Sequence, residues 1–166
     1  MFERVVVGID PGTAATGLAA VAERTGAGPV VLAAATVRTG AGTAEPLRLR
    51  TLHLAVTEAL RLHRPQAVAV ERLMWGRNTG SAMGVARATG VVLLAAAQEG
   101  IPVTEYGPLE VKMAVTGDGT ARKEDVRRML HRFLKVEGVP SQPDAADAVA
   151  VAVCHLHQAP LKAALR

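Results

Sequence analysis

The sequence predicts an α/β domain in which a five-stranded mixed sheet lies between two layers of helices. Three strand-like segments come first, and helices then alternate with two single strands. The helical segments carry apolar residues at helical spacing. A chain of 166 residues is long enough for one domain with a substantial core. We expect residues 1–158 to form this domain and residues 159–166 to form a short C-terminal extension.

The three early strands lie close together in the chain. Residues 5–10 (VVVGID), 16–22 and 30–39 are rich in β-branched and other apolar residues. The stretch ERTGAGP, which separates the second strand from the third, is typical of a turn. This close spacing indicates an antiparallel meander.

Helices and single strands alternate through the rest of the chain. Helices are predicted where apolar residues recur at intervals of three and four, and strands where a short apolar run stands alone. The expected elements are helix 44–62, strand 67–71, helix 81–99, strand 101–106, helix 109–115, helix 123–134 and a last helix from about Asp144 to about His157. In such folds a ligand site is expected at the carboxyl ends of the parallel strands.

The composition argues against several classes of protein. Apolar residues make up 49% of the chain and the mean hydropathy is +0.22, which argues against disorder. No run of eighteen uncharged apolar residues occurs, so we expect no membrane span, and the first residues resemble a strand and not a signal peptide. The single cysteine, Cys154, excludes an internal disulfide and fits a reducing cytoplasm, where we expect the protein.

The chain is basic, with a formal net charge of +4 and a pI near 9.8. Most of the basic residues are arginines, whose planar fork suits phosphate oxygens. A polyanionic partner such as nucleic acid is one explanation. The codon usage of a GC-rich genome is the other, and the composition leaves both open.

Two acidic residues end predicted strands. Asp10 closes VVVGID, where Asp-Pro-Gly is also a common tight turn. Glu71 follows AVAV directly, so its charge must lie at the rim of the sheet or be compensated, although glutamates at strand ends are common. Taken singly, each residue has a structural and a functional interpretation.

Two further acids, Asp144 and Asp147, lie three residues apart and therefore on one face of the last helix. Asp144 also suits the first turn of that helix, since Ser141 precedes it as in a capping box and acids favour a helix N-terminus. Asp147 is harder to explain structurally because apolar residues surround it on every side. An unpaired carboxylate in such a helix costs several kcal/mol unless a cation compensates it.

Together the four acids form a candidate metal site at the rim of the sheet. Carboxylates at close range do not all stay ionised without cations. Oxygen-only ligands suit Mg²⁺ or Mn²⁺, and no cysteine–histidine spacing indicates zinc. A pair of such ions is suited to phosphodiester hydrolysis.

The motifs GIDPGT, AVAVE, YGPLEVK and PDAADAVAVA stand in this order from Val5 to about His157. In their order and spacing they resemble the RuvC family of Holliday junction endonucleases. The resemblance implies a ribonuclease H-like three-layer α/β/α fold and a homodimer. It also implies Mg²⁺-dependent paired nicking of four-way junction DNA in recombination and repair. Further partners that it raises are the RuvA and RuvB branch-migration proteins.

The resemblance also implies roles for individual residues. Catalytic metal ligation falls on Asp10, Glu71, Asp144 and Asp147, with two Mg²⁺ per active site and Mn²⁺ as the alternative. DNA contacts fall on Lys112, Lys123, Arg122, Met74, Trp75, Arg77 and Asn78. Many family members carry a phenylalanine that stacks on a base at the position of Met74, so Trp75 is expected either to stack on DNA or to plug an apolar edge.

Three rival functions follow from the same residues. GIDPGTAATG also resembles the phosphate loop of actin-like ATPases and sugar kinases, but those proteins need two lobes and this chain supplies one. A second rival is a junction-binding relative without catalysis, which the presence of all four acids disfavours. A third is an RNA-processing nuclease with the same core, against which YGPLEVK and PDAADA argue.

Overall fold

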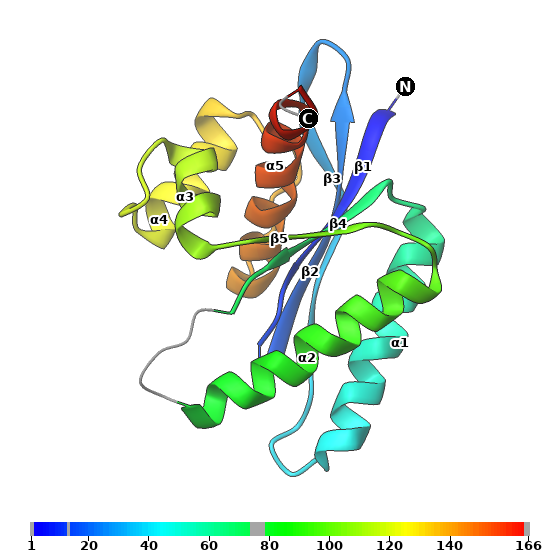
Figure 1. The fold of residues 1–166 in the computed structure, drawn as a ribbon. Coiled ribbons are helices and arrows are strands. Elements are labelled where there is room, and N and C mark those ends of the chain that lie inside the picture. The colour runs from blue at the N-terminus through cyan, green and yellow to red at the C-terminus, as the bar shows by residue number, and fades with distance from the viewer. Residues whose placement is uncertain (1, 13, 74–78, 165–166) are drawn as a thin grey trace.

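The computed structural model describes residues 2–12, 14–73 and 79–164 (Figure 1). Five strands form one sheet in the order β3-β2-β1-β4-β5, with helices on both of its faces. The predicted α/β class with a five-stranded mixed sheet is confirmed. The strands are β1 (Phe2–Asp10), β2 (Ala15–Arg24), β3 (Ala27–Arg38), β4 (Ala67–Glu71) and β5 (Val103–Tyr106).

The strand pairing brings the first two acids to one edge of the sheet. β1, β2 and β3 form an antiparallel meander, as expected, whereas β1 pairs with β4, and β4 with β5, in parallel. Ile9 lies opposite Val70, so Asp10 and Glu71 each follow at the carboxyl end of neighbouring parallel strands.

Two helical layers cover the sheet and enclose two apolar cores. On one face α1 and α2 pack over residues such as Val7, Ile9 and Val68. On the other face α5 packs over Val6, Ala19 and Val21, with α3 and α4 beside it (Figure 1). The helices are α1 (Glu45–His63), α2 (Thr79–Gln98), α3 (Pro108–Thr116), α4 (Lys123–Arg128), the π-helical turn η1 (Met129–Phe133) and α5 (Pro143–Ala164). Within the ranges described, no helix is long and apolar enough to cross a membrane.

The β2–β3 hairpin is tighter than predicted. Arg24 pairs with Ala27, which leaves Thr25 and Gly26 as a two-residue turn. Gly26 takes a φ of 70°, a left-handed conformation that glycine adopts at low cost. The stretch expected to be loop therefore extends both strands. Its charges are paired: Glu23 accepts a bond from Arg4, and Arg24 donates to Glu137.

The predicted helix over residues 123–134 is one α-helix only as far as Arg128. From Met129 it widens into a π turn, in which the N–H of Leu134 donates to the carbonyl of Met129 at 2.9 Å. Val126, Leu130 and Leu134 all pack on the core, but a spacing of four residues drifts away from one α-helical face. The wider turn corrects this drift.

The last helix continues beyond His157 to Ala164, further than predicted. Pro160 carries no N–H, so it cannot bond to the carbonyl of Leu156 one turn earlier. The side chain of Arg4 donates to that carbonyl at 3.1 Å and compensates it. α5 thus crosses residue 158 without a break, and a separate extension after that residue stays a prediction.

Two strand glycines let α5 lie directly on the sheet. A Cβ atom at Gly8 would overlap the carbonyl oxygen of Ala148, and one at Gly17 would overlap the carbonyl oxygen of Asp144. Both clashes are with backbone atoms, which cannot rotate away. Glycine inside a strand often marks such a close approach of another backbone. Here it sets the position of the helix that carries the last two acids.

We predict that Gly17→Ala lowers the free energy of unfolding by about 1–3 kcal/mol, because α5 must move to admit the methyl group. Chemical denaturation followed by circular dichroism measures this change. Gly42→Ala is the matched control, since a Cβ at Gly42 meets nothing within 4 Å. Equal stability of the two variants would show that close packing at Gly17 does not constrain α5.

Candidate active site

Three of the four predicted acids converge at the carboxyl edge of the parallel strands. The side chains of Asp10 and Glu71, from neighbouring strands, lie within hydrogen-bonding reach of each other. Asp147 reaches the same place from α5 and is close enough to act electrostatically on Asp10. The convergence arises because Asp10 follows Gly8 on the side of the sheet that α5 covers.

The proximity of these acids disfavours ionisation of Asp10. Burial is the largest cause and, together with the negative charges of Glu71 and Asp147, it raises the pKa of Asp10 to about 8. The ammonium group of Lys123 opposes this rise. Near neutral pH and without other cations, the Asp10 carboxyl group therefore retains a proton.

Lys123 compensates Asp147 directly. Its Nζ lies 2.5 Å from Oδ2 of Asp147, whose side chain is only 17% exposed. This hydrogen bond raises the pKa of Lys123, and the charges of Asp10 and Glu71 add to the effect. Asp147 was expected to need a nearby cation, and in the structure the ammonium group of Lys123 supplies it.

A small cavity joins these acids to the second predicted lysine. Glu71, Lys112, Lys123 and Asp147 line a space of about 70 Å³, with apolar walls from α3 and α4. Lys112 comes from α3, which begins at Gly107 just after β5. Cationic and anionic groups from four elements thus meet at one point of the sheet edge.

Asp144 lies apart from this group. Its Oδ2 is 3.3 Å from Nη2 of Arg38, at the end of β3, and its side chain is 37% exposed. Among the residues that the structure describes, no three Asp, Glu, His or Cys side chains form a ready-made metal site. The fourth predicted ligand is therefore on the expected helix face but bonded to an arginine.

The group Asp10, Glu71 and Asp147 nevertheless fits a hard divalent cation in its chemistry. All its donor atoms are carboxylate oxygens, which Mg²⁺ and Mn²⁺ prefer. Burial and the negative charges of Glu71 and Asp147 raise the pKa of Asp10 in spite of the nearby Lys123, so the site favours additional positive charge. A divalent cation at this place would supply that charge.

The remaining predicted DNA-binding residues fall into two groups. Arg122 is exposed at the N-cap of α4, where its N–H donates to Asp125 Oδ2 at 3.2 Å. Met74, Trp75, Arg77 and Asn78 lie outside the described residues.

Sequence reasoning missed two ion pairs at this edge. Arg38 was not singled out, although it pairs with Asp144. Arg72 follows Glu71 and lies 3.2 Å from Glu110, whose carboxylate also accepts the N–H of Gly107 at 2.7 Å. Glu110 therefore ties the end of β4 to the start of α3, which carries Lys112. Its position three residues after Gly107, typical of a capping box, was the available signal.

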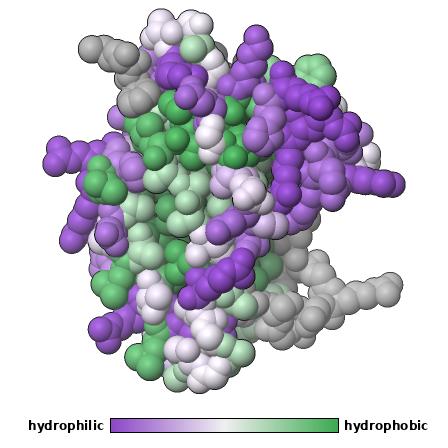
Figure 2. Space-filling model, turned by 180° about the vertical axis from the view of Figure 1, so that it is seen from behind, coloured by the Kyte–Doolittle hydropathy of each residue, from purple (hydrophilic) through white to green (hydrophobic). Residues whose placement is uncertain are grey.

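The molecular surface separates apolar from hydrophilic side chains. On the face seen in Figure 2, apolar and weakly polar side chains run down the middle, over the half-buried edge strand β3. Hydrophilic side chains gather at the upper right, on the side of α3 and α4. The basic segment 122–132 belongs to this part of the chain. Not all of its charges are available, since Arg128 is bonded to Asp125 at 3.2 Å.

Comparison with known proteins identifies the family. The family model described as "Crossover junction endodeoxyribonuclease RuvC" matches residues 6–155. The chain belongs to the RuvC family. The RuvC of Moorella thermoacetica is 46% identical over 156 residues, which cover 94% of this chain and 93% of that protein. The RuvC of Syntrophomonas wolfei is 44% identical over 153 residues, with 92% and 88% covered.

Solved RuvC structures have the same fold. That of Thermus thermophilus RuvC in complex with a Holliday junction substrate has a TM-score of 0.89 at 38% identity, covering 96% of this chain and 97% of that one. The yeast mitochondrial Holliday junction resolvase Ydc2 has a TM-score of 0.68 at 14% identity, with 95% and 82% covered, and shows the fold alone.

We predict that Asp10→Asn stabilises the metal-free protein in EDTA. The folded-state pKa of Asp10, about 8, lies above the ordinary value of 3.8. Ionisation of Asp10 therefore favours the unfolded chain progressively from about pH 4 to pH 8, and this loss of stability is complete above pH 8. Asparagine stays neutral throughout. Melting temperatures measured from pH 4 to pH 9 should diverge in favour of the variant, by about 2–4 °C for each kcal/mol removed.

Asp118→Asn is the control for this prediction. Hydrogen bonds from Thr120 lower the pKa of Asp118, the opposite direction, so its replacement brings no gain in stability. If Asp10→Asn and the wild type had the same melting temperature at every pH, ionisation of Asp10 would not destabilise the folded protein.

Proposed function

We propose that this protein is a nuclease that resolves Holliday junctions by paired, metal-dependent nicks in DNA recombination and repair. The observation that carries the proposal is the convergence of Asp10, Glu71 and Asp147 at the sheet edge of a RuvC-family chain. The Thermus thermophilus relative, with which the chain shares its fold, is known in complex with a Holliday junction substrate. Carboxylates gathered beside lysines suit the hydrolysis of a phosphodiester.

The proposed cofactor is Mg²⁺, two ions per active site, with Mn²⁺ as the alternative. The ions would be held by Asp10, Glu71, Asp144 and Asp147. Asp144 would have to give up its ion pair with Arg38 to bind a metal ion. Bound divalent cations supply Lewis-acid stabilisation of the attacking and leaving oxygens of the phosphodiester. The donor set, oxygen only and short of positive charge, supports this assignment.

We propose that the lysines of the site bind phosphate groups of the DNA backbone. Lys123 is bonded to Asp147, and replacement of that bond by a divalent cation would release its ammonium group for a phosphate oxygen. Lys112 lines the same cavity from the opposite helix. Arg122 and the segment with Met74, Trp75, Arg77 and Asn78 are further proposed contacts, which the motif resemblance supports.

Paired nicks require two active sites, so we propose that the protein works as a homodimer, with one site for each cut strand. RuvA and RuvB are the proposed further partners, and the cytoplasm is the proposed location. The lysines and acids described above lie within one copy of the chain, so each copy would cut one strand.

The rival functions are not favoured. The match of the RuvC family model over residues 6–155 favours a nuclease over a nucleotide-binding ATPase of the actin or sugar-kinase type. A non-catalytic junction-binding protein has no use for three acids whose proximity raises the pKa of Asp10.

We predict Mg²⁺-dependent, paired nicking of a synthetic mobile four-way junction. Asp147→Asn should lower the cleavage rate by more than about 100-fold, since even residues that only support metal ligands contribute 10–100-fold. Quantified gel electrophoresis of end-labelled strands measures both rate and symmetry. Linear duplex, RNA and ATP serve as alternative substrates.

The matched control is Asp118→Asn, which keeps the oxygen that accepts bonds from Thr120 in an exposed turn. It should cut at the wild-type rate. Robust cutting by Asp147→Asn, equal cutting of linear duplex, or ATP hydrolysis without DNA cleavage would each refute the proposed function.

We also predict that Trp75 stacks on a base near the junction centre. Aromatic stacking contributes about 1–3 kcal/mol per base, so Trp75→Ala should weaken junction binding by about 5- to 150-fold. A 2-aminopurine probe at the crossover reports the stacking through its fluorescence. Unchanged fluorescence, affinity and cleavage in Trp75→Ala would show that this tryptophan has no part in DNA distortion.

A further inference from the structure

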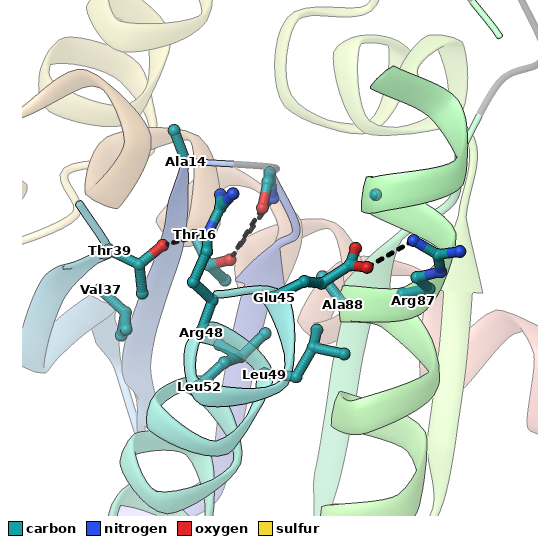
Figure 3. Close-up of a pocket in the computed structure, with 12 residues that line it drawn as sticks. Ala14, Thr16, Val37, Thr39, Glu45, Arg48, Leu49, Leu52, Arg87 and Ala88 are labelled. Atoms are coloured by element: carbon teal, nitrogen blue, oxygen red, sulfur yellow. Dashed lines mark hydrogen bonds and ion pairs between the residues drawn. The ribbon is translucent and has the colours of Figure 1, made fainter. Parts of the chain in front are cut away.

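A second cavity lies at the same edge of the sheet, on the face that α1 and α2 cover (Figure 3). Its volume is about 220 Å³, and it opens between the β1–β2 turn, the end of β3 and the helices α1 and α2. Gly12 in its wall is only two residues beyond Asp10. The cavity and the acid cluster thus border the same turn from opposite sides of the sheet.

The rim of this cavity is polar and positively charged overall. Arg48 from α1 donates through Nε to the hydroxyl of Thr39 at 2.9 Å, while Arg87 from α2 lies 2.5 Å from Glu45. Figure 3 shows Arg48 reaching up towards Thr16 at the start of β2, and Arg87 reaching in from the other helix. Two guanidinium groups thus face one carboxylate, beside two hydroxyls, above a partly apolar floor.

We propose that this cavity is a subsite for a backbone phosphate of the bound DNA, adjacent in the strand to the scissile phosphate. The inference rests on the proposed function, because it assumes that DNA crosses the sheet edge at the acids. The hydrogen bond from Nε of Arg48 to the hydroxyl of Thr39 orients the guanidinium group. A guanidinium group held in this way presents paired N–H groups to phosphate oxygens. The hydroxyl of Thr16, on the opposite wall, is buried and bonded to the backbone of Gly12, so the arginine is the donor that faces the cavity.

The distribution of cations supports a strand that continues in this direction. Lys112 and Lys123 lie on the α5 side of the acids. Arg48, bonded to Thr39 just beyond the end of β3, lines the cavity on the opposite face, whereas Arg38 turns to Asp144 of α5. Positive groups therefore flank the acid cluster on both sides. A DNA strand whose phosphates repeat along its length needs partners on both sides of the cut to be held in register.

A free nucleotide offers the same phosphate chemistry, and GIDPGTAATG was also compatible with a nucleotide phosphate loop. The DNA strand is favoured because Gly12 in the cavity wall is only two residues beyond Asp10, so the cavity borders the same turn as the acids. Binding of ATP to the wild type that is lost in Arg48→Gln would overturn the inference in favour of a nucleotide site.

The test is a methylphosphonate scan, which neutralises one backbone phosphate at a time near the cleavage position of a four-way junction. Dissociation constants are measured in EDTA, so that no cutting occurs. At one flanking position the neutral linkage should weaken wild-type binding by about tenfold. Arg48→Gln should weaken binding to the unmodified junction similarly, lower the salt slope by about 1, and abolish the effect of that linkage.

Arg61→Gln is the matched control, because Arg61 is also on α1 and is paired with Glu99 at 2.8 Å, but at the far end of the helix. It should keep the full methylphosphonate effect. Arg48→Lys, which retains the charge, should recover part of the affinity. If Arg48→Gln and the neutral linkage instead weaken binding independently at every position, the phosphate subsite is ruled out.

Glu45→Gln provides an independent test that misfolding cannot mimic. It removes the one carboxylate found among the described residues that line the rim, so junction binding should tighten severalfold and become more sensitive to salt. Weaker or unchanged binding would contradict the inference. Cleavage by the wild type in Mg²⁺, assayed in parallel, separates the two proposals. If the wild type does not cut the junction, the proposed function is refuted. If it cuts, but Arg48→Gln does not abolish the effect of any neutral linkage, only the phosphate subsite is refuted.

Discussion

The close packing of α5 on the sheet is the constraint on which the rest of the site depends. Gly8 and Gly17 leave no room for a side chain between the strands and the backbone of this helix. The helix is buried along most of its length, from Ala145 to Leu156. The carboxylate of Asp147, on the inner face of this helix, therefore lies at the edge of the sheet where Asp10 and Glu71 end their strands. The same apolar packing that stabilises the domain forces the acids together.

This arrangement leaves the edge of the sheet short of positive charge. Lys123 neutralises Asp147, and Arg38 neutralises Asp144, but burial and two neighbouring acids keep the pKa of Asp10 near 8. Such a cluster costs folding free energy in the absence of a divalent cation, and its carboxylate oxygens suit one in their chemistry. The cations around it, lysines on one side and arginines on the other, extend the same electrostatic pattern towards a polyanionic strand.

The sheet, its helices and the acidic residues of the site could be predicted from the sequence, because they depend on the spacing of apolar residues and on short motifs. The alternation of apolar runs predicts the sheet, and apolar residues around Asp147 indicate a buried charge in need of a partner. What could not be predicted depends on contacts between distant residues. Arg38 pairs with Asp144 across 106 positions of the chain, and the π turn at Met129 reflects a core that only the folded chain forms. The two-residue turn at Gly26 was missed because its flanking charges resemble a loop until their ion pairs are known.

The central proposal is that Asp10, Glu71 and Asp147 bind divalent cations at the edge of the sheet. Titration of the metal-free protein with Mg²⁺, followed by isothermal calorimetry, measures this most directly. We expect saturable binding to the wild type, with an affinity at least about tenfold weaker in Asp147→Asn. Asp125→Asn, which replaces an acid on α4 that is bonded to Arg128, should bind like the wild type. Equal Mg²⁺ affinity of the wild type and Asp147→Asn would contradict the proposal.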